Sequence, residues 1–223
     1  MKNLDTLRKL FSDQKLMDQA LTHRSWVNEH KNERRSNERM EFLGDAILEY
    51  VVSKQIYTRF SEKEEGYLTA LRANLVNTVA LAGVARKLNL GPFLFLSKGE
   101  EDGGGRENNS LLADTLEAII GAIFIDKGVE KSEEFIIKNI LPEVEKIAAT
   151  PLKDSKSRLQ EYVQSKGYPA PKYQVTEESG PDHNKKFVID VIVNGENWGR
   201  GEGKSKSTAE QEAARQVLSK KVQ

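Results

Sequence analysis

The chain has 223 residues and no cysteine, which excludes disulfide bonds, thiolate catalysis and zinc sites built from thiolates. Its 34 basic and 34 acidic residues give a net charge of zero, so the overall charge does not indicate a particular partner. No apolar run approaches the roughly 20 residues of a membrane span, and no signal peptide is recognisable. We therefore expect a cytoplasmic protein of one or two domains, without a membrane partner.

Apolar residues recur at intervals of three and four through the first 150 residues, a pattern that predicts helices. The predicted helices cover residues 4–11, 38–60, 65–88, 111–126 and 130–147. Asn37 is a candidate N-cap for the second helix, and Pro142 is expected to kink or divide the last one. The glycine-rich segment 100–110 is expected to be a mobile loop.

The pattern changes after a short linker near residues 148–154. A helix is predicted over 155–167, followed by strands with a two-residue period and a closing helix over 207–221. The strands cover 172–179, 185–194 and 196–203, with turns at 180–184 and at Asn194–Gly195. An α-β-β-β-α unit of this kind can pack one sheet on two helices. The predicted fold is therefore multidomain: an all-α domain over 1–148, then a small α+β domain over 153–222.

Charge differs slightly between the two parts. Residues 1–150 contain 21 Lys/Arg against 24 Asp/Glu, and residues 151–223 contain 13 against 10. The asymmetry is too small to identify a partner by itself, so the positions of the charged residues matter more than their sum.

The most informative segment is NERMEFLGD, residues 37–45. Glu38, Glu41 and Asp45 are spaced by three and seven residues, which brings all three carboxylates onto one helical face beside apolar residues. An acidic helix face is usually only solvated, and that alternative stays open on spacing alone. Gly44 costs a helix about 1 kcal/mol relative to alanine, so it indicates a close approach by another backbone.

A second acidic pair lies on another strongly apolar segment, LLADTLEAIIGAIF. Asp114 and Glu117 are three residues apart on one helical face, and Gly121 follows one turn later. Two apolar helices that both carry acids predict one shared, oxygen-rich site for a divalent metal ion.

The segment NERMEFLGDAIL closely resembles the signature of bacterial ribonuclease III, and the C-terminal unit resembles a double-stranded-RNA-binding domain. Three further blocks, at 20–26, 65–77 and 104–126, are similar to family segments and follow in the same order. The resemblance implies an endoribonuclease that hydrolyses both strands of double-stranded RNA with water as the nucleophile. It implies 5′-phosphate and 3′-hydroxyl ends with two-nucleotide 3′ overhangs, and processing of ribosomal RNA precursors and other structured transcripts, including messenger and transfer RNA.

The resemblance also implies roles for the acidic residues. Four of them are implied as metal ligands: Glu41, Asp45, Asp114 and Glu117. Of these, Asp45 and Glu117 are implied as the most important for cleavage. Two others, Glu38 and Glu65, resemble secondary catalytic acids of a cleavage valley near the subunit boundary, although a solvated or structural role is equally consistent for Glu65. Hard oxygen ligands suit Mg²⁺, with Mn²⁺ as an alternative. Such ions can activate water and neutralise charge on a phosphodiester, and no small-molecule cofactor is expected.

Residues of the C-terminal unit are candidates for RNA binding. Polar residues on one face of its first helix can reach 2′-hydroxyls across the minor groove: Ser157, Gln160, Glu161 and Gln164. An ordinary solvated helix face is the simpler alternative. The start of the last helix offers cations and free N–H groups to phosphates, but Ser207 stands where the family commonly has a lysine. The candidates are Ser157, Gln160, Glu161, Gln164, His183, Lys204, Ser205 and Lys206.

The remaining histidines and aromatic residues have simpler expected roles. His23 is expected to pack or hydrogen-bond within the helical domain, and His30 to be exposed. His183 lies in the turn that enters a minor groove in the RNA-binding family, so RNA contact is expected there, with a simple polar turn as the alternative. Trp198 is expected to be packed.

Cleavage of both strands most simply requires two acid clusters related by a twofold axis, so a homodimer is expected. Trp26, Met40 and Phe42 are candidates for the subunit contact, with core packing equally consistent. One alternative is a catalytically silent double-stranded-RNA-binding protein, which would have lost one or more of the acids. Another is a metal-dependent phosphohydrolase that acts on small molecules.

Overall fold

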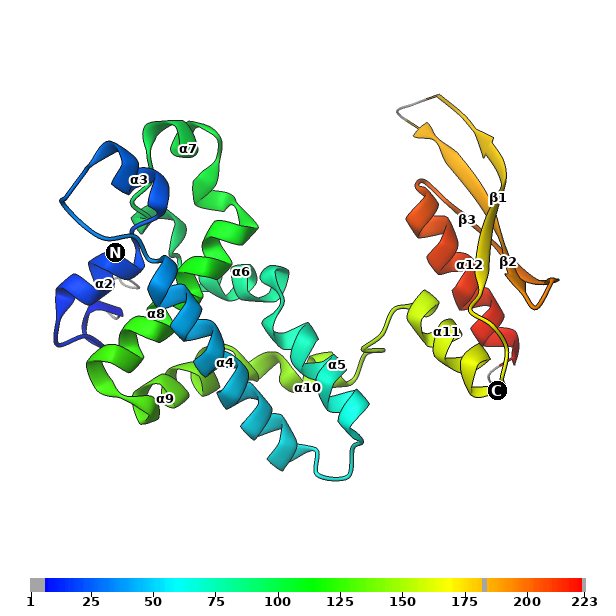
Figure 1. The fold of residues 1–223 in the computed structure, drawn as a ribbon, viewed down its shortest axis with the longest axis horizontal. Coiled ribbons are helices and arrows are strands. Elements are labelled where there is room, and N and C mark those ends of the chain that lie inside the picture. The colour runs from blue at the N-terminus through cyan, green and yellow to red at the C-terminus, as the bar shows by residue number, and fades with distance from the viewer. Residues whose placement is uncertain (1–6, 182–183, 222–223) are drawn as a thin grey trace. The chain divides into compact units, whose positions relative to one another are not determined.

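The computed structural model describes residues 7–181 and 184–221, which form two compact units divided between Leu152 and Lys153. The first, here the helical unit, contains nearly all the helices, and the second, the α+β unit, contains the sheet (Figure 1). The expected combination of an all-α part and a small α+β part is therefore confirmed.

The helices of the helical unit are α2 (Gln14–Ala20), α3 (Arg24–Glu29), α4 (Glu38–Arg59), α5 (Glu65–Val76), α6 (Thr78–Lys87), α7 (Lys98–Asp102), α8 (Asn109–Lys127), α9 (Val129–Asn139) and α10 (Val144–Ala148). Short 3-10 turns cover Gly91–Phe93, Gly105–Glu107 and Leu141–Glu143. The last turn contains Pro142 and separates α9 from α10, as the sequence predicts.

Helices α4 and α8 pack against each other at the centre of the helical unit (Figure 1). The middle of helix α8 is buried, with Leu116, Ile119 and Ile120 wholly inaccessible to solvent. At the crossing, a Cβ atom on Gly44 would overlap the carbonyl oxygen of Glu117, and one on Gly121 would overlap the carbonyl oxygen of Met40. The close backbone approach that Gly44 indicates is confirmed, and the partner helix is the one that carries the second acidic pair.

The long predicted helix over 65–88 is two helices, with the break at Asn77. Asn77 has extended backbone dihedrals, and its side chain accepts a hydrogen bond of 2.9 Å from the N–H of Ala80. An asparagine can cap a new helix in this way, so the apolar periodicity continues although the helix does not. Asn37 holds the N-cap position of α4, but its side chain donates to the carbonyl oxygen of Ala20 instead of capping.

The expectation of a mobile loop at 100–110 is wrong for most of the segment. Helix α7 covers its start, and a 3-10 turn covers Gly105–Glu107. Arg106 anchors this turn by donating to the carbonyl oxygens of Gly91 and Leu94, each at 3.0 Å, and to the carboxylate of Glu101. The hydrogen bonds of this one arginine thus fix the conformation of a segment that its glycines predicted to be a loop.

The N-terminal helix predicted over 4–11 begins outside the described residues, although the side chains of Leu7 and Phe11 lie in the core. Met40 is 4% exposed and packs in the core, so it does not contribute to an outer surface. His30 is half-buried, not exposed as predicted, because its ring stacks on Trp26 at a centroid distance of 4.1 Å.

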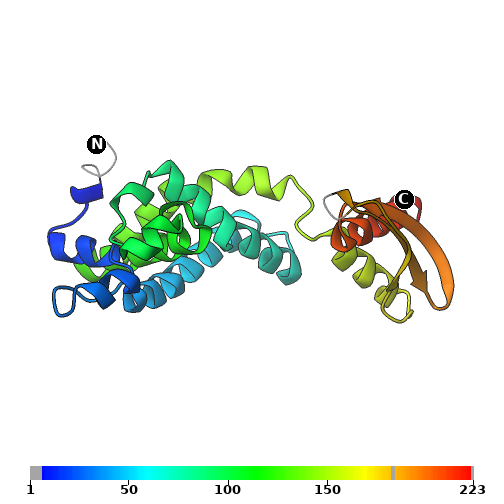
Figure 2. The same ribbon diagram turned by 90° about the horizontal axis from the view of Figure 1, so that it is seen from above.

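The α+β unit consists of α11 (Ser155–Ser165), β1 (Lys172–Ser179), β2 (Lys186–Val193), β3 (Glu196–Gly203) and α12 (Lys206–Lys221). The strands form one antiparallel sheet in the order β1-β2-β3, with both helices against one face (Figure 2). Asn194 and Gly195 both have positive φ, as the two-residue hairpin turn between β2 and β3 requires. Trp198 packs at the edge of the core against Tyr168, as expected.

Within the described residues, no single helix has both the length and the apolar character needed to cross a membrane. Helices α5 and α6 meet these criteria only when they are taken together, and the chain bends by 45° between them.

Replacement of Gly44 or Gly121 by alanine is expected to destabilise the protein by about 1–3 kcal/mol, because the added methyl group must force α4 and α8 apart. This cost exceeds the gain of about 1 kcal/mol that alanine brings to a helix interior. Gly83→Ala in α6 is the matched control, since nothing lies within 4 Å of the position that its methyl group would take, and it should stabilise. Urea denaturation followed by circular dichroism measures all three, and equal behaviour of the three variants would contradict the crossing.

Candidate functional site

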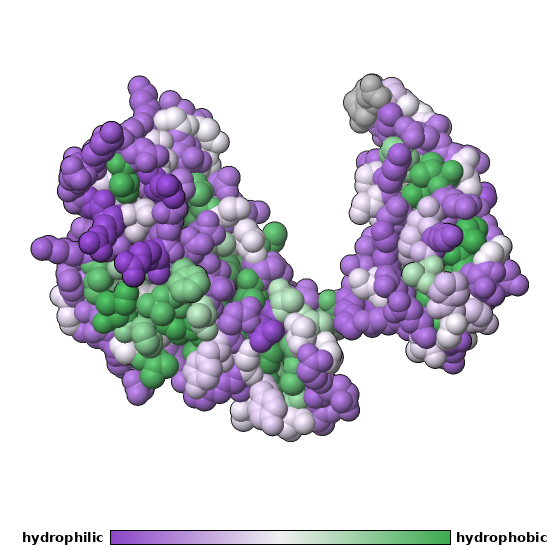
Figure 3. Space-filling view, in the orientation of Figure 1, coloured by the Kyte–Doolittle hydropathy of each residue, from purple (hydrophilic) through white to green (hydrophobic). Residues whose placement is uncertain are grey.

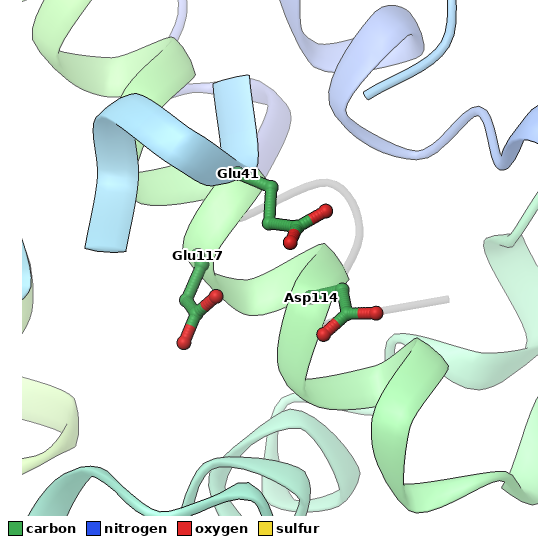
Figure 4. A group of neighbouring side chains, drawn as sticks. All are labelled: Glu41, Asp114 and Glu117. Carbon is green, nitrogen blue, oxygen red and sulfur yellow. The ribbon is translucent and has the colours of Figure 1, made fainter. Parts of the chain in front are cut away.

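Three carboxylates from two helices meet beside the glycine crossing. Glu41 comes from α4, and Asp114 and Glu117 come from successive turns of α8 (Figure 4). One carboxylate oxygen from each lies within 4.8 Å of those of the other two, and all three side chains are half-buried. The structure therefore brings these three predicted ligands together in one oxygen-rich cluster shared by the two acidic helices.

Burial and mutual repulsion shift the protonation of these acids. Burial, followed by the neighbouring charges of Asp45, Asp114 and Glu41, raises the pKa of Glu117 from 4.5 to about 8. Burial also raises the pKa of Glu41, with smaller contributions from Asp114 and Glu38, and it raises the pKa of Asp114. Without a cation the cluster therefore retains protons that isolated carboxylates would have lost.

Asp45 is placed differently from the other three acids. It lies one turn beyond Glu41 on α4 and is exposed, and it is not part of the three-residue cluster. Its charge nevertheless contributes to the raised pKa values of both Glu41 and Glu117, so it borders the cluster.

The two secondary acids lie in separate surroundings. Glu38 accepts a hydrogen bond of 2.8 Å from Arg24 and another of 2.8 Å from Ser36, and these bonds hold its pKa below the usual value. Glu65 begins α5 and accepts a bond of 2.7 Å from Thr69. It lines a pocket of about 400 Å³ beside Tyr57, and none of the clustered acids lines that pocket.

A cavity of about 300 Å³ adjoins the acid cluster. Its lining residues include Glu41 and Asp114 from the cluster, Glu38, and the two residues His23 and Arg24. His23 is the N-cap of α3, and its ring accepts a hydrogen bond from the N–H of Ser25, so the expected hydrogen-bonding role is confirmed. Arg24 was not singled out from the sequence, although it lies in one of the blocks that resemble the family.

The candidate RNA-binding side chains on α11 are all exposed: Ser157, Gln160, Glu161 and Gln164. Glu161 forms an ion pair with Lys153, and Ser157 is held by the N-cap Asp154. They share one exposed stretch of the helix, whereas Leu159 and Val163 face the core.

The three candidates at the other helix are also exposed. Lys204 and Ser205 precede α12, and Lys206 is its first residue. Ser205 accepts a hydrogen bond of 3.2 Å from the N–H of Thr208, so this serine caps the helix. His183 lies outside the described residues.

The donor set of the cluster fits a divalent metal ion. It offers carboxylate oxygens alone, as Mg²⁺ and Mn²⁺ prefer, and the chain contains no cysteine that could supply a thiolate. The raised pKa values of these half-buried carboxylates reflect burial and mutual repulsion, and a bound cation would relieve that repulsion.

Two family models cover most of the chain. The model described as ribonuclease-III-like matches residues 13–144, and the double-stranded RNA binding motif matches residues 155–221. Ribonuclease 3 of Streptococcus pneumoniae, strain CGSP14, is 44% identical over 226 aligned residues, which cover 99% of this chain and 97% of the relative.

Solved structures agree with this similarity. A structure of the nuclease domain of ribonuclease III from Campylobacter jejuni, concerned with flexibility in a region involved in dimer formation, is 41% identical. It has a TM-score of 0.57 and covers 62% of this chain and 96% of that one. A second structure of that domain, at 2.2 Å resolution, covers 64% of this chain with the same identity and TM-score. The carboxylate cluster, the two units and these similarities show that the chain belongs to the ribonuclease III family.

Proposed function

We propose that this endoribonuclease hydrolyses both strands of double-stranded RNA with the help of divalent metal ions, and that it leaves 5′-phosphate and 3′-hydroxyl ends with two-nucleotide 3′ overhangs. The observation that carries the proposal is the meeting of Glu41, Asp114 and Glu117 in one site of a chain that also contains a double-stranded RNA binding motif. Its expected substrates are ribosomal RNA precursors and other structured transcripts in the cytoplasm.

The catalytic domain in this proposal covers residues 1–148. Its metal ligands are Glu41, Asp45, Asp114 and Glu117, with Mg²⁺ as the physiological ion and Mn²⁺ as a substitute. Such an ion lowers the pKa of a bound water and neutralises charge on the scissile phosphate. Asp45 is the exposed member, so it is the ligand that faces the incoming substrate, while the half-buried acids are held by α4 (Glu41) and by α8 (Asp114 and Glu117).

Proton control at the cluster follows from the raised pKa of Glu117. In the metal-free protein this carboxyl group retains its proton near neutral pH, which relieves repulsion from Asp45 and Asp114. Glu117 loses the proton when it becomes a ligand, because only the ionised carboxylate binds a cation strongly.

The RNA-binding domain covers residues 153–222 and holds the duplex. The exposed face of α11 contacts the minor groove, and the N-terminal end of α12, with Lys204 and Lys206, contacts the phosphate backbone. Ser207 is exposed where the family commonly has a lysine, so we expect one phosphate contact fewer at this position.

A homodimer supplies the two acid clusters that cleavage of both strands requires. Phe42 supports this part of the proposal, because its side chain is 80% exposed on α4, next to the signature acids. Figure 3 shows that hydrophobic residues gather on this face of the helical unit around α4. A contiguous hydrophobic patch of this kind is typical of a surface that another protein covers.

The alternative is a catalytically silent double-stranded-RNA-binding protein. It would require the loss of at least one of the four acids, and the chain retains Glu41, Asp45, Asp114 and Glu117. The presence of all four acids therefore favours the enzyme.

The first prediction concerns cleavage itself. The protein should cut a fully paired RNA duplex with Mg²⁺ and not with EDTA, and Asp45→Asn or Glu117→Gln should lower the rate by at least about 100-fold, as expected for a lost group that stabilises transition-state charge. End mapping of the products measures the overhang. Glu145→Gln, an exposed acid on α10, is the control and should cut normally. Undiminished cutting by the Glu117→Gln variant would defeat the proposed site.

The second prediction follows from the pKa of about 8 for Glu117. Because this group binds its proton more tightly in the folded protein, the metal-free protein should lose stability as the pH rises from 4.5 through 8. Mn²⁺ binding at pH 7 should release about one proton, measurable by calorimetry in buffers of different ionisation enthalpy. Glu117→Gln should reduce both effects, because Glu41 and Asp114 also have raised pKa values and remain, while Glu145→Gln preserves them. Equal proton release from both variants would contradict the assignment.

The third prediction concerns the dimer. Phe42→Asp should convert a dimer into monomers in sedimentation experiments at micromolar concentration, because a charge cannot be buried in an apolar contact without a large cost. Tyr57→Asp is the matched control, since Tyr57 is 72% exposed on the same helix. A wild-type protein that sediments as a monomer and still cuts both strands would rule out the dimer.

A further inference from the structure

We propose that Arg24 binds a phosphate of the RNA in the cavity beside the acid cluster, and that Glu38 is the positioning residue that holds Arg24 there. This inference rests on the proposed nuclease function and deepens it. It gives the cavity a recognition role and separates Glu38 from the residues that bind the metal.

The geometry joins the two residues to the catalytic cluster. Arg24 begins α3 and Glu38 begins α4, and both line the cavity of about 300 Å³ that Glu41 and Asp114 also line. The Nη1 atom of Arg24 lies 2.8 Å from the Oε1 atom of Glu38. The guanidinium therefore lies in the same cavity as two of the clustered acids.

The charge balance of the cavity requires such a residue. Its acidic lining residues, Glu38, Glu41 and Asp114, repel a polyanion, and Arg24 is the one described lining residue that always carries a positive charge. The metal ions offset the charges of the clustered acids, but they do not orient the neighbouring phosphates of the strand. An arginine can do so, because its planar group binds two phosphate oxygens at once.

Glu38 is engaged at both of its oxygen atoms. Oε1 accepts from Arg24, and Oε2 accepts from the hydroxyl of Ser36, also at 2.8 Å. With both oxygen atoms engaged, this carboxylate is poorly placed to bind a metal ion, and its lowered pKa makes it a weak base. It instead fixes the direction of the arginine.

Arg24 remains available to a ligand while it is paired. Its side chain is 68% exposed, and the bond to Glu38 uses Nη1, whereas a guanidinium has five N–H donors. An exposed ion pair of this kind contributes little to stability, so its substitution should leave the fold intact. Its effect should therefore be visible in substrate recognition.

The test uses steady-state kinetics of the full-length protein with a paired RNA duplex and Mg²⁺. Arg24→Gln should lower kcat/KM about 10- to 100-fold, the range expected for one lost charge-assisted bond. The slope of log kcat/KM against log salt should become flatter by about one unit. Arg24→Lys, which retains the charge, should keep the salt slope and lose less activity.

The matched control is Arg59→Gln. Arg59 lies at the other end of α4 and pairs with Glu145 at 2.6 Å, with a side chain 51% exposed, so it repeats the ion pair away from the cavity. It should leave kinetics and salt slope unchanged. Mn²⁺ binding without RNA should be the same for Arg24→Gln, Arg59→Gln and the unsubstituted protein.

The role of Glu38 is tested by a double-mutant cycle. Glu38→Gln alone should lower kcat/KM less than Arg24→Gln does, and it should cause no further loss in the Arg24→Gln background. Fully additive losses would show that Glu38 acts independently, and a salt slope of Arg24→Gln equal to that of Arg59→Gln would overturn the phosphate contact. Failure of the nuclease function is recognised separately, because the unsubstituted protein would then not cut.

Discussion

The structure depends on one close contact between backbones, the crossing of α4 and α8 at Gly44 and Gly121. Each glycine lies where a Cβ atom would overlap a carbonyl oxygen of the opposite helix. The crossing brings the first turns of α4 within reach of the middle of α8. Glu41 can therefore meet Asp114 and Glu117, although the two helices lie far apart in the sequence.

The same crossing makes the site electrostatically unfavourable in the absence of a cation. Half-buried carboxylates are placed together where burial weakens their solvation, and the pKa of Glu117 rises to about 8 as a result. Helix α8 also places Leu116 and Ile119 in the core, and the burial of these apolar side chains offsets the unfavourable repulsion between the carboxylates. The crossing thus places together carboxylates whose mutual repulsion a bound cation would relieve.

The α+β unit also contains a close contact between backbones at a glycine. A Cβ atom on Gly201 of β3 would overlap the backbone nitrogen of Ala213, so α12 lies directly on the sheet. The apolar residues of α11 and α12 are buried in this packing, and the polar side chains of α11 remain on the outer surface. Close packing on one side therefore leaves the polar side chains of α11 exposed to solvent.

Much of this could be predicted from the sequence, because local rules decide it. The spacing of Glu38, Glu41 and Asp45 places them on one helical face, Gly44 indicates a close approach, and Asn194–Gly195 requires a hairpin turn. The break at Asn77 and the ordered segment around Arg106 were missed. Both depend on single side chains that bond to backbone groups, and periodicity does not report such bonds.

The sequence by itself determined the two-domain architecture, the acidic helices and the family, since these follow from periodicity, residue type and the order of motifs. Only the tertiary structure decided how the acids are divided. In the folded protein Glu41 lies with Asp114 and Glu117 in one cluster, and Asp45 is exposed at its border. Glu38 instead pairs with Arg24. Spacing along a helix specifies which residues share a face, but the packing of other helices against that face decides which of them become buried, paired or free.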